Sequence, residues 1–512
     1  MTPEPTRRQF LVAAAGAAAV LSGCGGSKPA ATGPADDELV WTPATELARL
    51  IRDKTLSPVE LTRAVLDRAE RLNADLHAFL HLDRDGAMAA AKAAEDAVMK
   101  GGSLGLLHGL PVSIKDGANV KGMPTTNGSR ITPTAAAAQD GSLAASTRAA
   151  GAVIFGKTNL PAFAHKDVTD NLLAPPCPTP WKAGYNSGGS SGGAGAAAAA
   201  GLGPLHHGSD GGGSIRIPAD RCGVFGFKPS IGRIGHPGSM TAAAVGHDGP
   251  LTRTVADAAL LMDVWSGPER LDYLSIDGPK PDFAGAVRAW EKSLRGRKVA
   301  LTFDYGWIPA VDPEVRRLVS AAAARFSDLG CAVEEVNLKW PNPIRAWEAL
   351  WYTTAAASRS KFAGHQDWID PTLLAQMDVG ATISGVEVAE ALQTKDVVFQ
   401  AVENFFAGHD LLLSPVCAVP AFPFDAPPTA AGGVPFVTGD VRRMIWNARI
   451  PFTPTFNMTG HPAASVPCGF TDAGLPVGLH VIAARHQDAL VLQAAAGFEA
   501  AQPWAAKRPP AP

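Results

Sequence analysis

Three short stretches of this sequence place a lysine and several serines where nucleophilic chemistry could occur. Lys115 lies in the apolar run "GLPVSIKD", Ser190 lies between glycine pairs in "GGSSGG", and Ser214 follows three glycines in "SDGGGSIRIP". Burial lowers the pKa of a lysine, so that its neutral amine can act as a base. A serine is a weak nucleophile unless such a base activates it. The three residue types therefore indicate acyl transfer.

The glycines before Ser214 indicate another part of such a site. Three consecutive glycines leave the backbone nearly free, which costs folding entropy. Bare backbone can also aim several N–H groups at one developing negative charge. A base, a bridging serine, a nucleophilic serine and an amide-rich loop would together form a complete machinery for acyl transfer.

These stretches resemble the motifs of the amidase signature enzymes, a family that uses a Lys–Ser–Ser triad. "GPLTRTVADAALLMD" and "FNMTGHPAASVPCGFTDAGLPVGLHV" read like family segments, as do "GLPVSIKD", "GGSSGG" and "SDGGGSIRIPADRCGVFGFKPS". The spacing agrees, with 75 residues from Lys115 to Ser190 and 24 from Ser190 to Ser214. The resemblance covers roughly residues 40–505.

The resemblance implies a catalytic role for three residues. Ser214 would be the nucleophile, Ser190 would relay protons, and Lys115 would be the base that drives the relay. In the family a cis peptide bond precedes the relay serine. The reaction would cleave a carboxylic amide through an acyl-enzyme, on a small-molecule substrate, without a metal or an organic cofactor.

Further residues of the glycine-rich loops also match the family motifs. The N–H groups of four consecutive residues would form the oxyanion hole: Gly211, Gly212, Gly213 and Ser214. Three more would support the loops: Ser191 through a hydrogen bond, and Asp210 and Arg216 as a brace.

Two places depart from the family pattern. Position 211 more often carries Thr, Ile or Ala, so Gly211 predicts a looser loop. The segment 164–181, "AHKDVTDNLLAPPCPTPW", is unlike the usual one, which helps to shape the acyl pocket. Phe163 aligns near the pocket wall in relatives, although a core phenylalanine fits equally well. Fatty, aryl, peptide and aminohexanoate-oligomer amides therefore all stay open as substrates.

Other functions fit the same residues less well. "GGSSG" satisfies the G-x-S-x-G pattern of α/β-hydrolase-like esterases, but "KAGYNS" before it is not a strand. Ser358 and Lys361 form S-x-x-K without the companion motifs of penicillin-binding enzymes. His206 and His207 lack a third metal ligand at suitable spacing. A catalytically inactive, lipid-anchored binding protein is the remaining alternative, and the intact triad argues against it.

The first residues are typical of an export signal. Arg7 and Arg8 precede an apolar run over residues 10–21, which is too short to span a bilayer. The arginine pair indicates the twin-arginine route. "LSGC" resembles a bacterial lipoprotein processing box, which implies cleavage before Cys24 and lipidation of its thiol. We expect a signal peptide over 1–23, a flexible tether over 24–38, and a membrane anchor on the periplasmic or extracytoplasmic face.

Composition limits the other function classes. The 512 residues carry a net charge of −3 and no long block of like charge, which argues against nucleic-acid binding. The family also has an amidotransferase branch that acts on aminoacyl-tRNA with a cytoplasmic partner. An export signal argues against membership of this chain in that branch. Five cysteines remain after Cys24, at wide spacings, and buried free thiols are favoured over disulfides or a metal site.

The elements that must position these residues alternate between helices and strands. We predict helices at 84–100, 312–330 and 487–499, a further helix near 441–449, and a helix starting at the Ser57–Glu60 cap. Strands are predicted at 152–156, 298–303, 410–416, 463–470 and 476–484. This alternation predicts an α/β fold, and the family resemblance specifies a large mixed β-sheet surrounded by helices. We expect one domain over residues 39–505.

Overall fold

The computed structural model describes residues 34–132, 134–237, 245–435 and 446–510. Its centre is one sheet of eleven strands. The strands of the sheet are β1 (Phe79–Leu82), β2 (Pro111–Lys115), β3 (Val153–Thr158), β4 (Leu205–Asp210), β5 (Phe225–Lys228), β6 (His247–Thr252), β7 (Lys298–Leu301), β8 (Ala332–Glu335), β9 (Leu411–Pro415), β12 (Ala463–Phe470) and β13 (Pro476–Ala483). A separate hairpin joins β10 (Ala430–Ala431) and β11 (Val434–Pro435).

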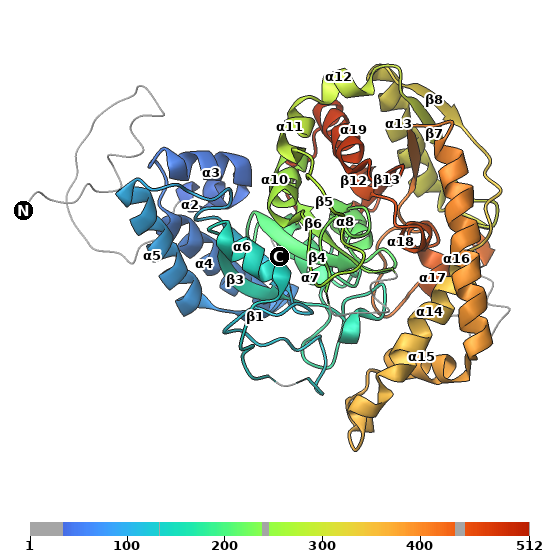
Figure 1. The fold of residues 1–512 in the computed structure, drawn as a ribbon, viewed down its shortest axis with the longest axis horizontal. Helices are drawn as coiled ribbons and strands as arrows, with labels where there is room; N and C mark the ends of the chain where they lie inside the picture. Colours follow the sequence, from blue (N-terminus) through green and yellow to red (C-terminus); the bar gives the residue numbers. More distant parts are fainter. Residues whose placement is uncertain (1–33, 133, 238–244, 436–445, 511–512) are drawn as a thin grey trace, which may run out of the picture.

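The strand order is β1-β3-β2-β4-β6-β5-β12-β13-β9-β7-β8. Parallel pairs lie near both ends of this order, β3-β2-β4 and β9-β7-β8, and antiparallel pairs connect them. The predicted large mixed sheet surrounded by helices is therefore confirmed. Figure 1 shows the sheet between helices along the whole body.

The helices form groups at the two ends and on the faces of the sheet. Those before the central strands are α2 (Pro34–Trp41), α3 (Ala44–Arg52), α4 (Pro58–Leu76), α5 (Arg84–Lys100) and α6 (Ser142–Ala149). Next in the chain are α7 (Gly192–Ala199), α8 (Arg216–Cys222), α10 (Val255–Trp265), α11 (Phe283–Arg288), α12 (Trp290–Leu294) and α13 (Pro313–Asp328). The others are α14 (Ile344–Ala357), α15 (Pro371–Thr382), α16 (Gly385–Phe406), α17 (Trp446–Arg449), α18 (Pro454–Met458) and α19 (Asp488–Ala501).

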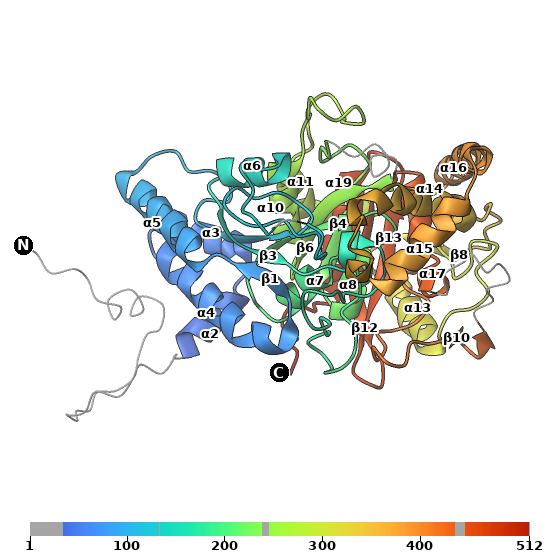
Figure 2. The ribbon, with the colours of Figure 1, turned by 90° about the horizontal axis from the view of Figure 1, so that it is seen from below.

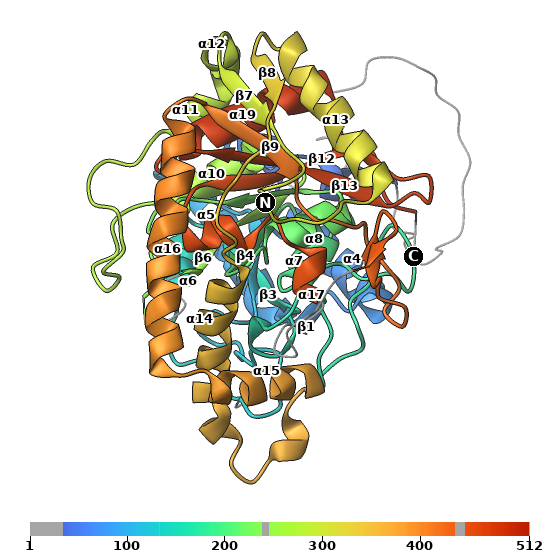
Figure 3. The same cartoon turned by 90° about the vertical axis from the view of Figure 1, so that its right-hand side faces the viewer.

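Helices α2 to α5 lie at one end of the molecule, and α14 to α16 lie at the other (Figure 2). Figure 3 shows α16 as a long helix along the outer edge, with α14 beside it and α15 at their base. Close packing of α14 on α15 requires Gly380, since an added Cβ would lie 1.9 Å from the carbonyl oxygen of Tyr352. The α14–α15–α16 group is thus a tightly packed support at this end.

Several predicted elements are confirmed. Ser57 caps α4 by accepting hydrogen bonds from the N–H groups of Val59 and Glu60. Helix α5 ends at Gly101, which has the left-handed φ of 76°. Strands β3, β7, β9, β12 and β13 lie within two residues of their predicted bounds. The five cysteines of the described chain are buried free thiols, as predicted.

Only the end of the predicted N-terminal region lies within the residues that the structure describes. Cys24, the predicted signal peptide and most of the predicted tether lie outside the described residues. Helix α2 begins at Pro34, inside the range 24–38 that was predicted to be flexible. Proline suits the first turn of a helix, where its missing N–H has no partner to lose. None of the helices in the described ranges is both long and apolar enough to cross a bilayer.

The central strands β2 and β4 position the candidate residues at one edge of the sheet. Strands β2 and β4 run parallel as neighbours, with Ser113 opposite His206. Strand β2 ends at Lys115, and β4 ends at Asp210, where the glycine loop begins. Because the carboxyl ends of parallel strands meet at one edge, the lysine and the glycine loop lie side by side.

Candidate active site

Lys115 is buried at the end of β2, and its side chain is surrounded by hydroxyl groups. Its Nζ lies 2.7 Å from Ser190 Oγ, 2.8 Å from Ser191 Oγ and 2.9 Å from Ser209 Oγ. The carbonyl oxygen of Ser209 is a further partner at 3.3 Å. In the described part of the chain, the recorded partners of this nitrogen are all oxygen atoms without a formal charge. The structure thus brings Lys115, Ser190 and Ser191 into direct contact.

Burial lowers the pKa of Lys115 to about 7, although the charges of Asp210 and Asp248 oppose this shift. Removing an ammonium group from water disfavours its charged form. Hydroxyl groups can accept from an ammonium or donate to a neutral amine, so they suit both protonation states. Near neutral pH, a large fraction of this lysine is therefore the free base.

The neighbouring Asp116 does not neutralise Lys115. Asp116 is the first residue after β2, and its recorded side-chain partners are Lys157 and Thr126. Its Oδ1 lies 3.0 Å from the Nζ of Lys157, with which it forms a buried ion pair, and its other oxygen accepts a hydrogen bond from the Thr126 hydroxyl. The Asp116 carboxylate thus pairs with Lys157 and not with Lys115, whose ammonium group is surrounded by neutral hydroxyl groups.

The backbone of Lys115 is held by a histidine. Its N–H donates to Nδ1 of His207 at 3.3 Å, and Nε2 of the same ring lies 2.9 Å from Asp248 Oδ1. An imidazole that accepts at Nδ1 donates from Nε2, so this network fixes the ring orientation. Asp248 also bonds Nδ1 of His236 at 2.6 Å, and that ion pair raises the pKa of His236 to about 9.

The "GGSSGG" stretch packs tightly against another part of the chain. The peptide bond between Gly189 and Ser190 is cis. An added Cβ at Gly189 would lie 2.6 Å from the backbone nitrogen of Val168, which leaves room only for glycine. Helix α7 begins directly after Ser191. Val168 belongs to the segment 164–181, which departs from the family pattern. That segment therefore contacts the site directly.

A buried ion pair between Asp210 and Arg216 supports the glycine loop. Two nitrogens of the Arg216 guanidinium each lie 2.9 Å from a different carboxylate oxygen of Asp210. Both side chains are buried, and the guanidinium also donates to Asn457 at 2.6 Å and to the Thr453 carbonyl at 3.1 Å. These contacts hold the pKa of Asp210 well below its usual range, despite its burial. The carboxylate is thus a fixed charge that organises the loop.

This brace corrects part of the predicted oxyanion hole. The N–H of Gly213 donates to Asp210 Oδ1 at 2.6 Å, so it is not available to a substrate oxygen. The Ile215 N–H donates to the other oxygen at 3.1 Å. Within the described residues, no acceptor is recorded for the N–H groups of Gly211, Gly212 and Ser214. These three remain the candidate donors, and Gly213 is removed from the set because Asp210 uses its N–H.

Two side chains fix the carbonyl groups of the same loop, so its N–H groups have defined directions. Trp347 Nε1 donates to the Gly211 oxygen at 2.8 Å, and the Thr453 hydroxyl donates to the Gly212 oxygen at 2.6 Å. The looser loop expected from Gly211 stays a prediction, although the space beside this glycine is filled. The Trp351 ring lies where its side chain would be, with Cζ3 2.6 Å from the position of an added Cβ.

Ser214 lies on the wall of a cavity of about 490 Å³ together with Lys115 and Ser190. The Ser191 N–H donates to the Ser214 carbonyl at 3.1 Å and joins the two loops. In the described residues the Ser214 hydroxyl has no recorded hydrogen bond, so it shares the cavity with Ser190 and Lys115 without a direct bond to either. Catalytic hydrogen bonds are often long before substrate binds and tighten in the complex. Phe163 lines the same cavity, as the resemblance implied.

Other candidate residues have structural explanations. His206 is buried, with Nδ1 2.7 Å from Ser113 Oγ and Nε2 3.0 Å from the Gly203 oxygen. Ser358 caps the end of α14 and donates to the Ala355 carbonyl at 2.7 Å. Neither residue lines the cavity that contains Ser214.

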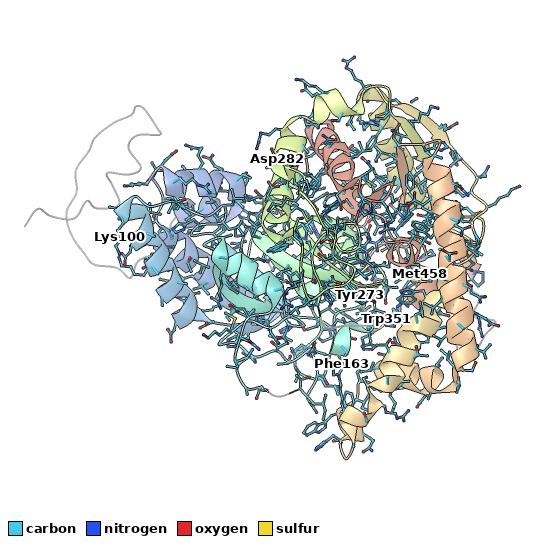
Figure 4. The ribbon with its side chains drawn as sticks, viewed as in Figure 1. Lys100, Phe163, Tyr273, Asp282, Trp351 and Met458 are labelled. Carbon is cyan, nitrogen blue, oxygen red and sulfur yellow. The ribbon has the colours of Figure 1, made fainter. Side chains whose placement is uncertain are left out.

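Sequence reasoning missed several residues of the site. Ser209 begins the quoted loop stretch and contacts Lys115, and the alternation of side chains along β4 places it on the same face as His207. That alternation was a usable signal. Trp347, Trp351 and Thr453 come from distant segments, and no local pattern connects them to the loop. Figure 4 labels Phe163 and Trp351, which come from the η1 turn (Ala162–Ala164) and from α14 and line the same cavity.

Comparison with known proteins agrees with this architecture. The Amidase family model matches residues 60–492. An acylamidase from Rhodococcus erythropolis is 37% identical over 486 residues, which cover 93% of this chain and 98% of the relative. A glutamyl-tRNA(Gln) amidotransferase subunit from Desulforapulum autotrophicum is 34% identical, over 88% of this chain and 95% of the relative.

Solved structures show the same fold. A bacterial aryl acylamidase of the amidase signature family superposes with a TM-score of 0.83 at 33% identity, covering 91% of this chain and 97% of that chain. The 6-aminohexanoate cyclic dimer hydrolase superposes with a TM-score of 0.82 at 29% identity, covering 92% and 99%. The chain therefore belongs to the amidase signature family, and it is a hydrolase that acts on carbon–nitrogen amide bonds.

Proposed function

We propose that Ser214, Ser190 and Lys115 hydrolyse the amide through an acyl-enzyme on Ser214. The observation that carries this proposal is the 2.7 Å contact between Lys115 Nζ and Ser190 Oγ, on the wall of the cavity that contains Ser214. A lysine with a pKa of about 7 is a competent base at neutral pH. Ser190 lies between this base and the nucleophile in the proposed proton path.

The reaction begins when Ser214 Oγ attacks the amide carbon. Its proton passes to Ser190 Oγ, while the proton of Ser190 passes to Lys115 Nζ. The negative charge on the substrate oxygen is stabilised by the N–H groups of Gly211, Gly212 and Ser214, for which the described chain provides no other recorded acceptor.

The same relay then works in reverse. The proton on Lys115 returns through Ser190 to the amide nitrogen, the carbon–nitrogen bond breaks, and the amine leaves. Water attacks the ester that remains on Ser214, with the relay again taking the proton. The carboxylic acid departs, and the proton returns to Ser214.

A serine-directed fluorophosphonate, followed by mass spectrometry, tests the nucleophile. We expect one covalent adduct, on the peptide that contains Ser214, and none in Ser214→Ala. Ser358→Ala is the matched control, since Ser358 lies outside the cavity, and it should label like the wild type. An adduct on Ser190 or Ser358 in place of Ser214 would overturn the assignment.

We further infer from the N-terminal sequence that the chain is exported by the twin-arginine route and anchored by lipid on Cys24. "TRRQFL" and "LSGC" support this proposal. Two or more acyl chains anchor a protein stably, whereas one holds it only marginally. The substrate would then be met outside the cytoplasm, on the periplasmic or extracytoplasmic face.

Labelling of cells with a clickable fatty acid tests the anchor. The wild-type protein should carry the label and sediment with membranes, and Cys24→Ala should lose both properties. Cys177→Ala, at a buried cysteine, is the control and should keep the label. Unlabelled wild-type protein in the cytoplasm would contradict the proposal.

A further inference from the structure

Two cavities of very different size meet at Ser214. The large one has a volume of about 490 Å³ and contains Ser214 on its wall. The small one has a volume of about 10 Å³ and is lined by Ser214, Gly212 and Gly189. About 10–15 Å³ is the space that one water molecule needs, so the small cavity admits a group of about methyl size.

The proton relay lies in only one of these cavities. Lys115 and Ser190 line the large cavity and are absent from the wall of the small one. In the proposed mechanism the amide nitrogen must accept a proton from Ser190 before the amine can leave. A leaving amine in the large cavity would lie beside this relay, and the acyl chain, on the other side of the carbonyl carbon, would enter the small cavity.

The small cavity has rigid walls. Ile217, Trp347 and Ile450 line it, and all three are buried. Trp347 is fixed by its hydrogen bond to the Gly211 carbonyl. Trp351 stacks on Trp347 with a ring distance of 5.5 Å and an angle of 16°. A longer acyl chain would need several of these contacts to change.

Two further residues on the wall of the small cavity are also held by hydrogen bonds. His165 and Lys166 line it. His165 Nε2 lies 2.7 Å from the Thr372 hydroxyl, and Lys166 Nζ lies 3.2 Å from Asp370. Both partners belong to the start of α15. The unusual segment 164–181 is thus fastened to the helical group that carries the two tryptophans.

Part of the wall of the large cavity is aromatic and aliphatic, beside polar residues such as Asn119 and Asn127. Phe163, Leu143 and Leu160 line this part, and so does Trp351, which also lines the small cavity. Aromatic side chains recognise flat rings through offset or edge-to-face contacts. A bulky aromatic amine fits this surface better than ammonia or a small alkylamine.

We propose that this enzyme selects amides with a short acyl group, of about acetyl size, and a bulky amine that carries an aromatic ring. The inference rests on the proposed function, because the relay decides which cavity receives the leaving group. It assigns Ile450 and Ile217 as residues that limit acyl length, and Phe163 and Trp351 as residues that bind the amine.

Two isomeric secondary amides test the orientation directly. N-Benzylacetamide has a small acyl group and a bulky amine, whereas N-methyl-2-phenylacetamide has the same atoms with the sizes reversed. Both release an alkylamine, so their intrinsic reactivity is similar. We expect kcat/KM to be at least about tenfold higher for N-benzylacetamide. Equal values, or a preference for the phenylacetyl compound, would overturn the proposal.

A series of anilides with acetyl, propionyl, butyryl and hexanoyl groups tests the acyl limit. We expect kcat/KM to fall about tenfold for each added methylene beyond acetyl. Ile450→Ala enlarges the small cavity and should raise the ratio of hexanoyl to acetyl activity by about tenfold or more. Leu350→Ala removes the same number of carbon atoms from the same buried cluster without lining either cavity, and should leave this ratio unchanged.

These results can be separated from a failure of the proposed mechanism. Labelling of Ser214 by the fluorophosphonate, combined with a preference for long acyl chains in the wild type, would remove only the size assignment. Absence of a Ser214 adduct would remove the mechanism itself. The wild-type acyl series stays decisive even if Ile450→Ala fails to fold.

Discussion

Trp351 occupies the space that a side chain at position 211 would need. An added Cβ on Gly211 would lie 2.6 Å from Cζ3 and 2.8 Å from Cη2 of the indole ring. The ring has little freedom to move, because it stacks on the buried Trp347. In this chain, the glycine of the loop and the tryptophan of α14 are therefore a complementary pair.

The pair predicts a compensating double mutant. Gly211→Ala should lower the free energy of unfolding by about 1–3 kcal/mol, as forced overpacking does. In a Trp351→Ala background the same change should cost much less, and a double-mutant cycle from denaturant unfolding measures the difference. Gly102→Ala is the control, since an added Cβ there meets nothing within 4 Å. Purely additive changes in the free energy of unfolding would show that the Trp351 ring moves aside at little cost.

The relay predicts strongly non-additive losses of activity. Lys115→Ala and Ser190→Ala each interrupt the same proton path, so each should lower kcat by several orders of magnitude. The kcat of the double variant should be little lower than that of the worse single variant, because removal of either residue already interrupts the whole proton path. Single-turnover kinetics with one anilide provide the measurement. Losses that multiply would indicate that the two residues act independently.

The pH dependence follows from the lowered pKa of Lys115. The base is neutral above its pKa and protonated below it, so activity should fall as the pH is lowered. The acid limb of kcat/KM reports the free enzyme, and its midpoint should lie at about pH 7. Three histidines line the cavity, His207, His236 and His247, and the pKa values of the last two are shifted away from 7. Burial lowers the pKa of His247 well below its usual value, and Asp248 raises that of His236 to about 9.

The residual activity of Lys115→Ala provides the matching control for this pH profile. It should no longer show the acid limb, since the titrating base is gone. A limb that persists unchanged in this variant would assign the titration to another group. A wild-type midpoint more than about two pH units from 7 would contradict a lysine with the lowered pKa.

The buried brace of the loop predicts a large loss of stability. Arg216→Met leaves the Asp210 carboxylate buried without its charged partner, which typically costs about 3–5 kcal/mol. Arg49→Met is the surface control. Arg49 is 58% exposed and pairs with Glu46 and Asp53, and loss of such a pair costs less than about 1 kcal/mol. Denaturant unfolding compares the two variants, and similar losses would contradict the structural role of the Arg216 brace.

Several local elements and the family could be predicted from the sequence alone. Apolar periodicity and capping residues placed α4, α5 and α13, because these helices follow from short-range patterns. Strands β12 and β13 were also recognisable from their continuous apolar character. The motifs around Lys115, Ser190 and Ser214 carried the resemblance because their glycines and hydroxyls are adjacent in the chain.

Some central strands escaped the sequence analysis for a physical reason. Strand β4 reads "LHHGSD", without an apolar pattern, because its polar side chains are satisfied by the site itself. His206 bonds Ser113, His207 bonds Asp248, and Ser209 bonds Lys115. Burial of such residues is stable only when distant partners meet their hydrogen bonds, which local propensity cannot reveal.

Only the tertiary structure decided what surrounds the reactive serine. The sequence assigned four N–H groups to the oxyanion hole, and the fold gives that of Gly213 to Asp210. The sequence indicated only a looser loop at Gly211, whereas the structure places the ring of Trp351, from a segment 140 residues away, beside this glycine. The sizes of the two cavities depend on α14, α15 and the segment 164–181 packing together. Short-range patterns determine which groups can react, whereas long-range packing determines which substrates can reach them.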